Sequence, residues 1–217
     1  KIIVVQSFGI PKLNLRFSDR IVVRSGKGGV PVALVVNKSD MASDDDFEYV
    51  KEYYKGSGVD VFFVSALTGD GLSNLKELIS KKRNLLVGYS GVGKSSLLNK
   101  LYPALDLRTS EVSESTGKGR HTTTNVHLVR LPDGTEIIDT PGVREFGLVD
   151  VDPYTLGNYF MDFKKASLKC KFRPCSHEHE PGCEVKRLVD KGKIHEERYI
   201  SYLNILYSIK ENLKNMY

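Results

Sequence analysis

The sequence of 217 residues predicts an α/β fold in which a mostly parallel sheet carries flanking helices, followed by a small helical domain. Short apolar runs such as Val32–Val36 have the length and β-branched content of buried parallel strands. Segments with apolar residues at helical spacing alternate with these runs, which is the order that builds βαβ units. A cluster of cysteine and histidine residues follows near the C-terminus. We therefore expect two domains, at residues 1–150 and 151–217.

The composition is that of an ordinary soluble protein, with 40% apolar and 27% charged residues. No apolar run is long enough to cross a bilayer and no secretory signal opens the chain, so we expect a cytoplasmic protein with no membrane partner. Residues 164–193 hold nine lysines and arginines against four acids. This local surplus fits either an RNA-binding face or an ordinary solvated surface.

The chain opens with a β-branched strand at residues 2–5 and a helix at residues 14–24, which the glycines of residues 26–29 end. The strand Val32–Val36 then leads directly into Asn37-Lys38-Ser39-Asp40. The Asp40 carboxylate can accept two hydrogen bonds from the N1–H and the amino group of guanine, a donor pair that adenine lacks. Asn37 would connect neighbouring loops, and the Lys38 stem would cover the base. This tetrapeptide predicts guanine selectivity.

A second helix and strand complete the predicted base pocket. Ser43 has the position of a helix N-cap before three acids, and an apolar stripe follows it. The strand at residues 59–64 delivers Ser65-Ala66-Leu67, whose backbone amides would donate to the base O6. A helix with apolar residues between Leu72 and Ile79 then returns the chain to the start of the next strand.

Residues 88–96 match the pattern of a phosphate-binding loop, G-x-x-x-x-G-K-S, between a strand at 85–87 and a helix at 96–101. At such a corner, backbone N–H groups and the positive end of the helix dipole face phosphate oxygens. Lys94 would reach the β- and γ-phosphates, and the Ser95 hydroxyl would bind Mg²⁺. The alternative is a glycine-rich turn that matches by chance. The expected nucleotide contacts here are Gly88, Ser90, Gly91, Val92, Gly93, Lys94, Ser95 and Ser96.

The segment after this helix predicts the γ-phosphate-sensing part of the site. Residues 108–120 read as a loop, which ends at His121 and three threonines, and we expect Thr124 to complete the Mg²⁺ shell. A hairpin at residues 125–138 follows, and its second strand ends in Asp139-Thr140-Pro141-Gly142. Asp139 would hold Mg²⁺ through water, and the Gly142 N–H would contact the γ-phosphate.

All three cysteines of the chain fall within fourteen residues, as Cys170, Cys175 and Cys183. With one histidine they make the ligand set of a closed tetrahedral zinc site, and both His177 and His179 are available. Such a site would be structural. Disulfides are disfavoured by the odd count, and free thiols are the alternative. Two helices should follow, one around residues 185–189 and one around 199–213, the second packing on its own domain or binding a partner.

The order of the motifs is unusual, because base recognition precedes the phosphate loop and the switch motifs come last. The chain therefore resembles a circularly permuted GTPase, a rearrangement that close termini permit. Among these it resembles the RsgA (YjeQ) family of ribosome small-subunit GTPases, on the strength of Gly119–Thr124, Asp139–Phe146 and the cysteine–histidine cluster. The resemblance favours His177 over His179 as the fourth zinc ligand.

The resemblance implies a function. It implies a factor of late small (30S) ribosomal subunit maturation that binds and hydrolyses GTP, and whose hydrolysis the subunit stimulates. The implied cofactors are GTP or GDP, Mg²⁺ and one structural Zn²⁺, and the implied RNA partner is 16S rRNA. Members of the family also have an N-terminal OB-fold domain, which we expect to be absent from these 217 residues. We expect a monomer.

The expected catalytic residues are His121, Lys94 and Thr124. Val143 stands where many GTPases have a glutamine that orients the attacking water, and valine cannot make that hydrogen bond. His121 could take over that role, or it could be purely structural. Two other functions stay open: a nucleotide-gated RNA- or ribosome-binding module with incidental hydrolysis, and a permuted GTPase of large-subunit assembly. Asp40 argues against an adenine-nucleotide enzyme.

Overall fold

The computed structural model describes residues 1–105, 127–139, 148 and 150–215. The chain divides into two compact units that interleave along the sequence. The first comprises Lys1–Asn14, Pro31–Phe47 and Asp60–Glu145, and the second comprises Leu15–Val30, Glu48–Val59 and Phe146–Tyr217. Helix α1 (Leu15–Lys27) and most of α2 (Asp44–Tyr54) thus belong to the same unit as the C-terminal helices.

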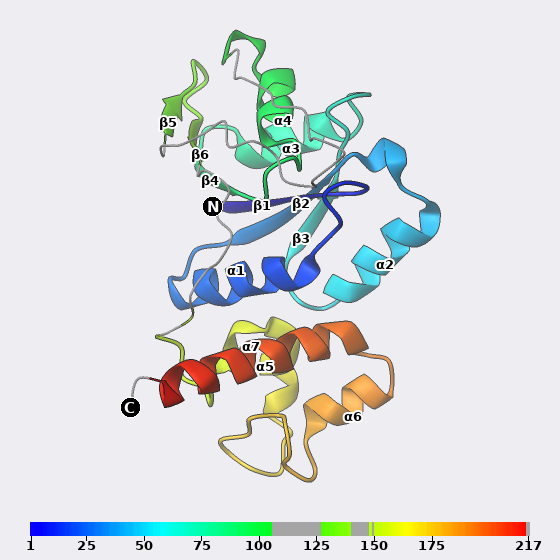
Figure 1. Ribbon diagram of the computed structural model, residues 1–217, viewed down its shortest axis with the longest axis vertical. Coiled ribbons are helices and arrows are strands. Elements are labelled where there is room, and N and C mark those ends of the chain that lie inside the picture. Colours follow the sequence, from blue (N-terminus) through cyan, green and yellow to red (C-terminus); the bar gives the residue numbers. More distant parts are fainter. Residues whose placement is uncertain (106–126, 140–147, 149, 216–217) are drawn as a thin grey trace. The chain divides into compact units, whose positions relative to one another are not determined.

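Among the described residues of the first unit, six strands form one sheet, in the order β3-β2-β1-β4-β6-β5 (Figure 1). They are β1 (Ile2–Ser7), β2 (Val32–Asn37), β3 (Asp60–Phe63), β4 (Arg83–Val87), β5 (His127–Arg130) and β6 (Glu136–Asp139). All pairs are parallel except β5 with β6. The central strand β1 pairs on both sides, Ile2 lying opposite Val32 of β2 and Leu85 of β4. This arrangement confirms the predicted mostly parallel α/β sheet.

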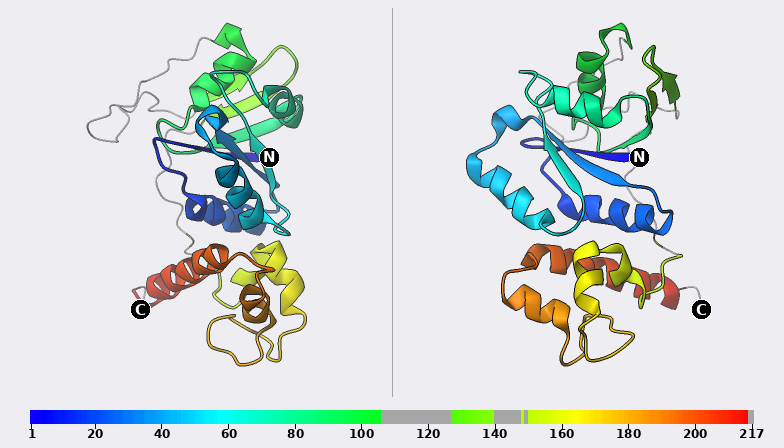
Figure 2. Two further views of the ribbon diagram at one scale, coloured as in Figure 1. Left: turned by 90° about the vertical axis from the view of Figure 1, so that its right-hand side faces the viewer. Right: turned by 180° about the vertical axis from the view of Figure 1, so that it is seen from behind.

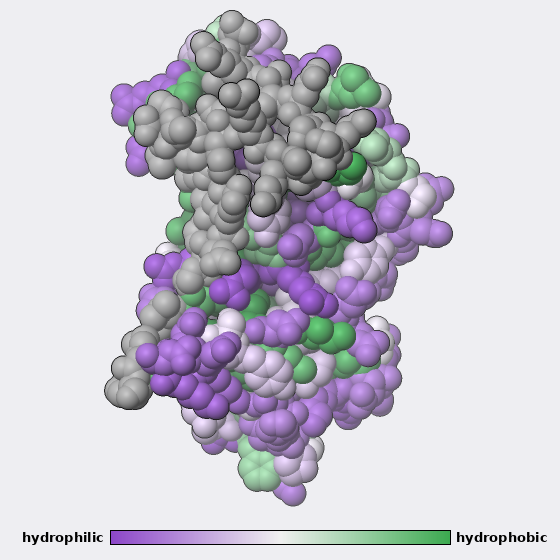
Figure 3. All heavy atoms as spheres, in the orientation of Figure 1, coloured by the Kyte–Doolittle hydropathy of each residue, from purple (hydrophilic) through white to green (hydrophobic). Residues whose placement is uncertain are grey.

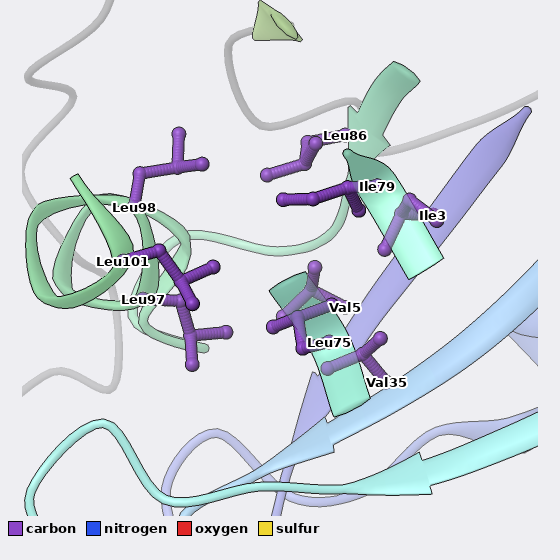
Figure 4. A pocket seen from close by; sticks show the side chains of 9 residues that line it. All are labelled: Ile3, Val5, Val35, Leu75, Ile79, Leu86, Leu97, Leu98 and Leu101. Atoms are coloured by element: carbon purple, nitrogen blue, oxygen red, sulfur yellow. The ribbon is translucent and has the colours of Figure 1, made fainter. Parts of the chain in front are cut away.

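Helices α3 (Leu72–Ile79) and α4 (Lys94–Leu101) cover one face of this sheet (Figure 2). Because side chains alternate along a strand, Ile3 and Val5 of β1 both point to this face. Figure 4 shows these residues and Val35 facing the leucines of α4, around a cavity lined only by aliphatic side chains. The cavity therefore belongs to the hydrophobic core that supports α4 and offers no polar group to a ligand.

The start of α2 shows how local sequence determines an element. The Ser43 hydroxyl accepts a hydrogen bond from the Asp46 N–H at 3.3 Å, and the Asp46 carboxylate accepts one from the Ser43 N–H at 2.9 Å. These reciprocal bonds form a capping box. The hydrogen bonds that the Asp46 carboxylate accepts from the Ser43 N–H and from the Ser43 hydroxyl lower the pKa of Asp46 below its ordinary value. The predicted N-cap at Ser43 is thus confirmed.

The second unit is helical. It contains α1, most of α2, and the elements η3 (Leu156–Tyr159), α5 (Met161–Ser167), α6 (Glu184–Asp190) and α7 (Glu196–Lys214). Its core joins Val23 of α1 to apolar residues of α5, α6 and α7, among them Phe163, Val185 and Ile205. The apolar stripe predicted around residues 199–213 is therefore buried in part against its own unit.

A buried arginine organises the packing of these helices. Arg198 of α7 is 1% exposed and donates to Asp19 of α1 at 2.6 Å and to Asp162 of α5 at 2.7 Å. Asp19 also accepts from the Tyr53 hydroxyl of α2 at 2.6 Å. The guanidinium lies 4.8 Å from the centre of the Phe160 ring. One cation thus connects four segments of the second unit, and sequence reasoning did not single it out.

Some boundaries differ from the prediction. Helix α1 continues to Lys27 and ends within the expected glycine-rich stretch, and α4 begins two residues earlier than expected, at Lys94. Strand β3 is shorter than the predicted range 59–64 because only residues 60–63 pair with β2. Short 3₁₀ turns occur at η1 (Ser39–Met41) and η2 (Pro103–Leu105). Helix α5 was not predicted.

Among the helices that the structure describes, none combines the length and the apolar character that crossing a bilayer requires. On the face shown in Figure 3, the described residues are mostly hydrophilic and the hydrophobic ones form small separate groups.

Candidate functional site

The phosphate-binding motif lies at the corner between β4 and α4, as predicted. Strand β4 ends at Val87 and α4 begins at Lys94, so the loop of residues 88–93 presents its backbone at the helix N-terminus. Val92 is fully buried and anchors the loop in the core. Four other residues of the motif that we expect to contact the nucleotide are half-buried around this corner. They are Ser90, Gly91, Ser95 and Ser96.

Two glycines are required here by space. A Cβ at Gly88 would lie 2.3 Å from the carbonyl oxygen of Val5, and one at Gly93 would lie 2.2 Å from the side-chain nitrogen of Asn37. Gly93 also has a φ of 93°, which a residue with a Cβ rarely adopts. The loop can therefore pack against Val5 of β1 and Asn37 of β2 only with glycine at both positions.

Lys94 lies over its own loop. Its ammonium group donates to the carbonyl oxygens of Gly88 at 2.8 Å and Tyr89 at 3.1 Å. These bonds hold a positive charge beside the loop N–H groups, where an anionic phosphate would bind.

Asn37 connects the segment that we predict to recognise the base to the predicted phosphate loop. Its side-chain nitrogen donates to the Val92 carbonyl at 2.9 Å, and its side-chain oxygen accepts from the Ala66 N–H at 3.1 Å. Asn37 is 2% exposed; its bond to Val92 is buried and its bond to Ala66 is partly buried. Three predicted parts of the site, from 37–40, 65–67 and 88–95, are thereby brought together at the carboxyl edge of the sheet.

The Asp40 carboxylate, which we predict to recognise guanine, is held by Ser65. The Ser65 hydroxyl donates to one oxygen of Asp40 and accepts from the N–H of Leu67 at 3.2 Å. Asp40 itself stays exposed. The amides of Ala66 and Leu67 thus already donate within the protein, so donation to a base would require them to share or exchange these partners.

Lys38 adopts a left-handed backbone conformation with a φ of 60°. Its ammonium group donates to the carbonyl of Ile10, in the loop after β1. Burial lowers the pKa of Lys38, and the nearby charge of Asp40 opposes that shift. The side chain is thus held beside the candidate base pocket.

Part of the predicted site lies outside the described residues. These positions are the loop at 108–120, His121, Thr122 to Thr124, Gly142 and Val143. The backbone of Asp139 is described at the end of β6, in register with Leu86 of β4. Since Leu86 precedes the phosphate loop by two residues, Asp139 ends its strand at the edge of the sheet that carries the loop.

The second candidate site is in the other unit. Cys170, Cys175, His177 and Cys183 each offer one ligand atom, and these atoms all lie within 4.8 Å of one another. Nδ1 of His177 is 3.7 Å from Sγ of Cys170 and 3.4 Å from Sγ of Cys183. The two sulfurs are 4.0 Å apart. In a tetrahedral zinc site, sulfurs about 2.3 Å from the metal are roughly 3.8 Å apart, so the spacing fits zinc.

The geometry separates the two candidate histidines. His177 is 2% exposed and faces the sulfurs, whereas the side chain of His179 is 85% exposed and pairs with Glu178 at 3.1 Å. All three cysteines are free thiols. Burial raises the pKa of Cys175 to about 12, so a bound cation would have to replace thiol protons. This set of ligands fits one structural cation.

Comparisons with known proteins identify the family of the chain. Residues 1–149 match the sequence profile of the RsgA GTPase family. The chain belongs to this family. It is 38% identical over 215 residues to the small ribosomal subunit biogenesis GTPase RsgA 1 of Vibrio vulnificus. The aligned region covers 98% of this chain and 61% of that protein. The chain thus spans about three fifths of that relative.

Two solved structures, of YjeQ and YloQ, confirm the fold. The crystal structure of YjeQ from Thermotoga maritima has a TM-score of 0.80 at 34% identity, covering 96% of this chain and 70% of that one. The structure of YloQ, described as a circularly permuted GTPase, has a TM-score of 0.76 at 29% identity, covering 97% and 68%. The predicted membership of the RsgA family and the predicted permuted α/β fold are therefore confirmed.

Several residues around the Cys170–Cys183 cluster have no local sequence pattern that would indicate their contacts. The Tyr199 and Tyr202 hydroxyls of α7 bond the metal-ligand loop, and Gly157 packs against the His177 ring. Tyrosines in an apolar stripe look like core residues in sequence, and nothing local shows that their hydroxyls reach a loop more than twenty positions away.

Proposed function

We propose that the protein binds and hydrolyses GTP and acts in late maturation of the small (30S) ribosomal subunit, which stimulates the hydrolysis. The observation that carries the proposal is the side chain of Asn37, bonded to both the phosphate loop and the Ser65–Leu67 segment. A chance glycine-rich turn would have no reason to be joined to a guanine-recognition motif. Membership of the RsgA GTPase family supports the same conclusion.

In this proposal the residues have distinct roles. Asp40 accepts from guanine, and Lys94 moves from its loop carbonyls to the β- and γ-phosphates. Ser95 and Thr124 hold Mg²⁺, with Asp139 acting through water, and the Gly142 N–H contacts the γ-phosphate. His121 orients the attacking water, since Val143 cannot. Mg²⁺ would supply charge neutralisation at the phosphates.

The metal ion and the RNA partner that we propose concern the C-terminal part of the chain. We propose one structural Zn²⁺ on Cys170, Cys175, His177 and Cys183, and 16S rRNA as a partner of the exposed basic residues of 164–193. We propose a cytoplasmic monomer and retain residues 1–150 and 151–217 as the GTPase and zinc-binding domains. The metal-ligand cluster favours a small-subunit factor over a permuted GTPase of large-subunit assembly.

GTP turnover with and without purified small subunits tests the proposal. We expect the subunits to raise turnover at least about tenfold, as partner-stimulated GTPases show, and Lys94→Ala to remove the stimulated rate. Equal turnover with and without subunits would overturn the proposed stimulation of hydrolysis by the subunit. His121→Ala with an unchanged stimulated rate would overturn the role of His121.

A second candidate is a nucleotide-gated RNA-binding module in which hydrolysis is incidental, and Val143 favours it. This module would bind small subunits more tightly with a non-hydrolysable GTP analogue than with GDP. Its turnover would nevertheless stay at the intrinsic rate when subunits are added. The same turnover experiment therefore separates the two functions.

A further inference from the structure

The backbone of His177 is held in an unusual conformation. Its φ is 59°, in the left-handed region that residues with a Cβ adopt at a cost in energy. In this conformation Nδ1 faces Sγ of Cys170 and of Cys183. An extended or right-handed His177 would direct the imidazole elsewhere, so the fourth ligand depends on this one backbone conformation.

Two tyrosine hydroxyls hold the peptide planes on either side of His177. Tyr202 donates to the Ser176 carbonyl at 2.8 Å, and Tyr199 donates to the His177 carbonyl at 2.7 Å. Because peptide groups are planar, the orientations of these two carbonyls determine φ and ψ of the residue between them. The two hydrogen bonds therefore act directly on the strained residue.

Both tyrosines lie on one helix. Positions three apart lie on the same face of a helix, so α7 presents the two hydroxyls together. Tyr202 is fully buried and Tyr199 is half-buried. Lys210 of the same helix pairs with Glu178, the residue after His177. Helix α7 therefore binds the metal-ligand loop at three successive residues.

The far side of the imidazole is closed by backbone. A Cβ at Gly157 would lie 2.9 Å from Nε2 of His177 and 3.1 Å from Cδ2. The Phe163 ring meets the imidazole edge to face, with 6.1 Å between the ring centres. The ring thus has little room to turn once its backbone is fixed.

We infer that Tyr199 and Tyr202 are positioning residues of the metal centre, which hold His177 in the left-handed conformation that aims Nδ1 at the cysteine sulfurs. The inference rests on the metal centre proposed above. A ligand held in place before binding loses less freedom when the metal binds, so the two hydroxyls strengthen metal affinity. Partners that orient metal ligands typically change metal affinity by roughly 10- to 100-fold.

A merely structural role for the hydroxyls predicts something different. If they only satisfied two buried carbonyls, their removal would lower the stability of the unit but leave the geometry around a bound metal intact. Cobalt(II) distinguishes these cases, because its visible spectrum reports the number and type of its ligands. The spectrum of a His177→Ala variant provides the reference for a centre that has lost its histidine.

The experiment uses the full chain with Tyr199→Phe, Tyr202→Phe and the double variant. Tyr154→Phe is the matched control, since Tyr154 lies in the same unit and is 62% exposed. Zn²⁺ affinity is measured by competition with a chromophoric chelator, and the Co²⁺ spectrum is recorded for each protein. Circular dichroism checks that each variant is folded. If the double variant does not fold, the comparison is made with Tyr199→Phe alone, because that position is only half-buried.

We expect the double variant to bind Zn²⁺ about 10-fold more weakly or worse than Tyr154→Phe, and its Co²⁺ spectrum to shift towards that of His177→Ala. Zn²⁺ affinities and Co²⁺ spectra equal to those of Tyr154→Phe would overturn the inference while leaving the metal centre in place. If the wild-type chain bound neither Zn²⁺ nor Co²⁺, the proposed metal centre itself would fail, and the inference with it.

Discussion

The side-chain amide of Asn37 donates to the backbone carbonyl of Val92 across 2.9 Å, although the two residues are 55 positions apart in the chain. The same side chain accepts from the Ala66 N–H. One buried residue thus joins the segment that would read the base to the loop that would hold the phosphates.

Asn37→Ala should therefore weaken guanine nucleotide binding without removing any direct phosphate ligand. The substitution leaves the buried Val92 carbonyl without its partner, at a cost of about 1–3 kcal/mol, and also removes the partner of the partly buried Ala66 N–H. We expect GDP affinity, measured by calorimetry, to fall at least about tenfold. Asn204→Ala, at an exposed position of α7, is the control; equal GDP affinities in the two variants would contradict the role of Asn37.

The two histidines near the cysteines provide a matched pair. His177→Ala removes a ligand atom from the cluster, whereas His179→Ala removes an 85% exposed side chain outside it. We expect atomic emission to find one Zn²⁺ per chain in the wild type and in His179→Ala, and a largely empty site in His177→Ala after mild chelation. Loss of zinc from both variants to the same extent, or from His179→Ala alone, would show that the ligand assignment is wrong.

Arg198 should be needed for the stability of the second unit. Arg198→Met leaves Asp19 and Asp162 buried without a cation, and breaking a buried pair in this way costs about 3–5 kcal/mol. We expect urea unfolding to show a loss of this size, and adding Asp19→Asn and Asp162→Asn to restore part of it. Arg187→Met, at an exposed position, should change little. Unfolding free energies of Arg198→Met within error of the wild type would refute this prediction.

Asp150 gives a pH-dependent contribution to stability. Hydrogen bonds from Lys27 and Arg24 lower the pKa of Asp150 to about 2. Because an unfolded aspartate titrates near about 3.9, the ion pairs stabilise the fold above that pH, and their contribution is lost as the pH falls towards 2. Asp150→Asn should thus have a lower urea midpoint than the wild type at pH 7.

The difference between the two proteins should shrink between about pH 4 and pH 2, with Asp190→Asn as an exposed control. A difference that stays constant over this range would show that Asp150 does not act through these ion pairs.

The residues that we predict to bind the nucleotide are found from sequence because they form short local motifs. The loop at 88–95 follows an apolar strand, and Asn37–Asp40 follows another, so each motif carries its own context. The parallel sheet then places both strand ends at one edge. Ser43 as an N-cap was predictable for the same reason, since its partner Asp46 is three positions away.

Features that depend on contacts between distant parts of the chain, or on very short helices, could not be predicted from the sequence. The partners of Arg198 are 179 and 36 positions away, so nothing near it in sequence shows that it is buried. Helix α5 has seven residues and too few turns to show an apolar period. The resemblance favours His177 over His179, but nothing local to residue 177 indicates its left-handed backbone or the tyrosine of α7 that bonds its carbonyl.

Calorimetry of GDP, ADP and XDP with the wild type and with Asp40→Asn tests directly whether the Asp40 carboxylate selects guanine. A carboxylate at position 40 matches the two donors of guanine, whereas an amide, with one donor and one acceptor, matches the N1–H and the 2-oxo group of xanthine. We predict that the wild type binds GDP far more tightly than ADP or XDP, and that Asp40→Asn loses about 100-fold in GDP affinity and prefers XDP. Equal affinity of the wild type for GDP and ADP, or an unchanged preference for GDP in Asp40→Asn, would contradict the account.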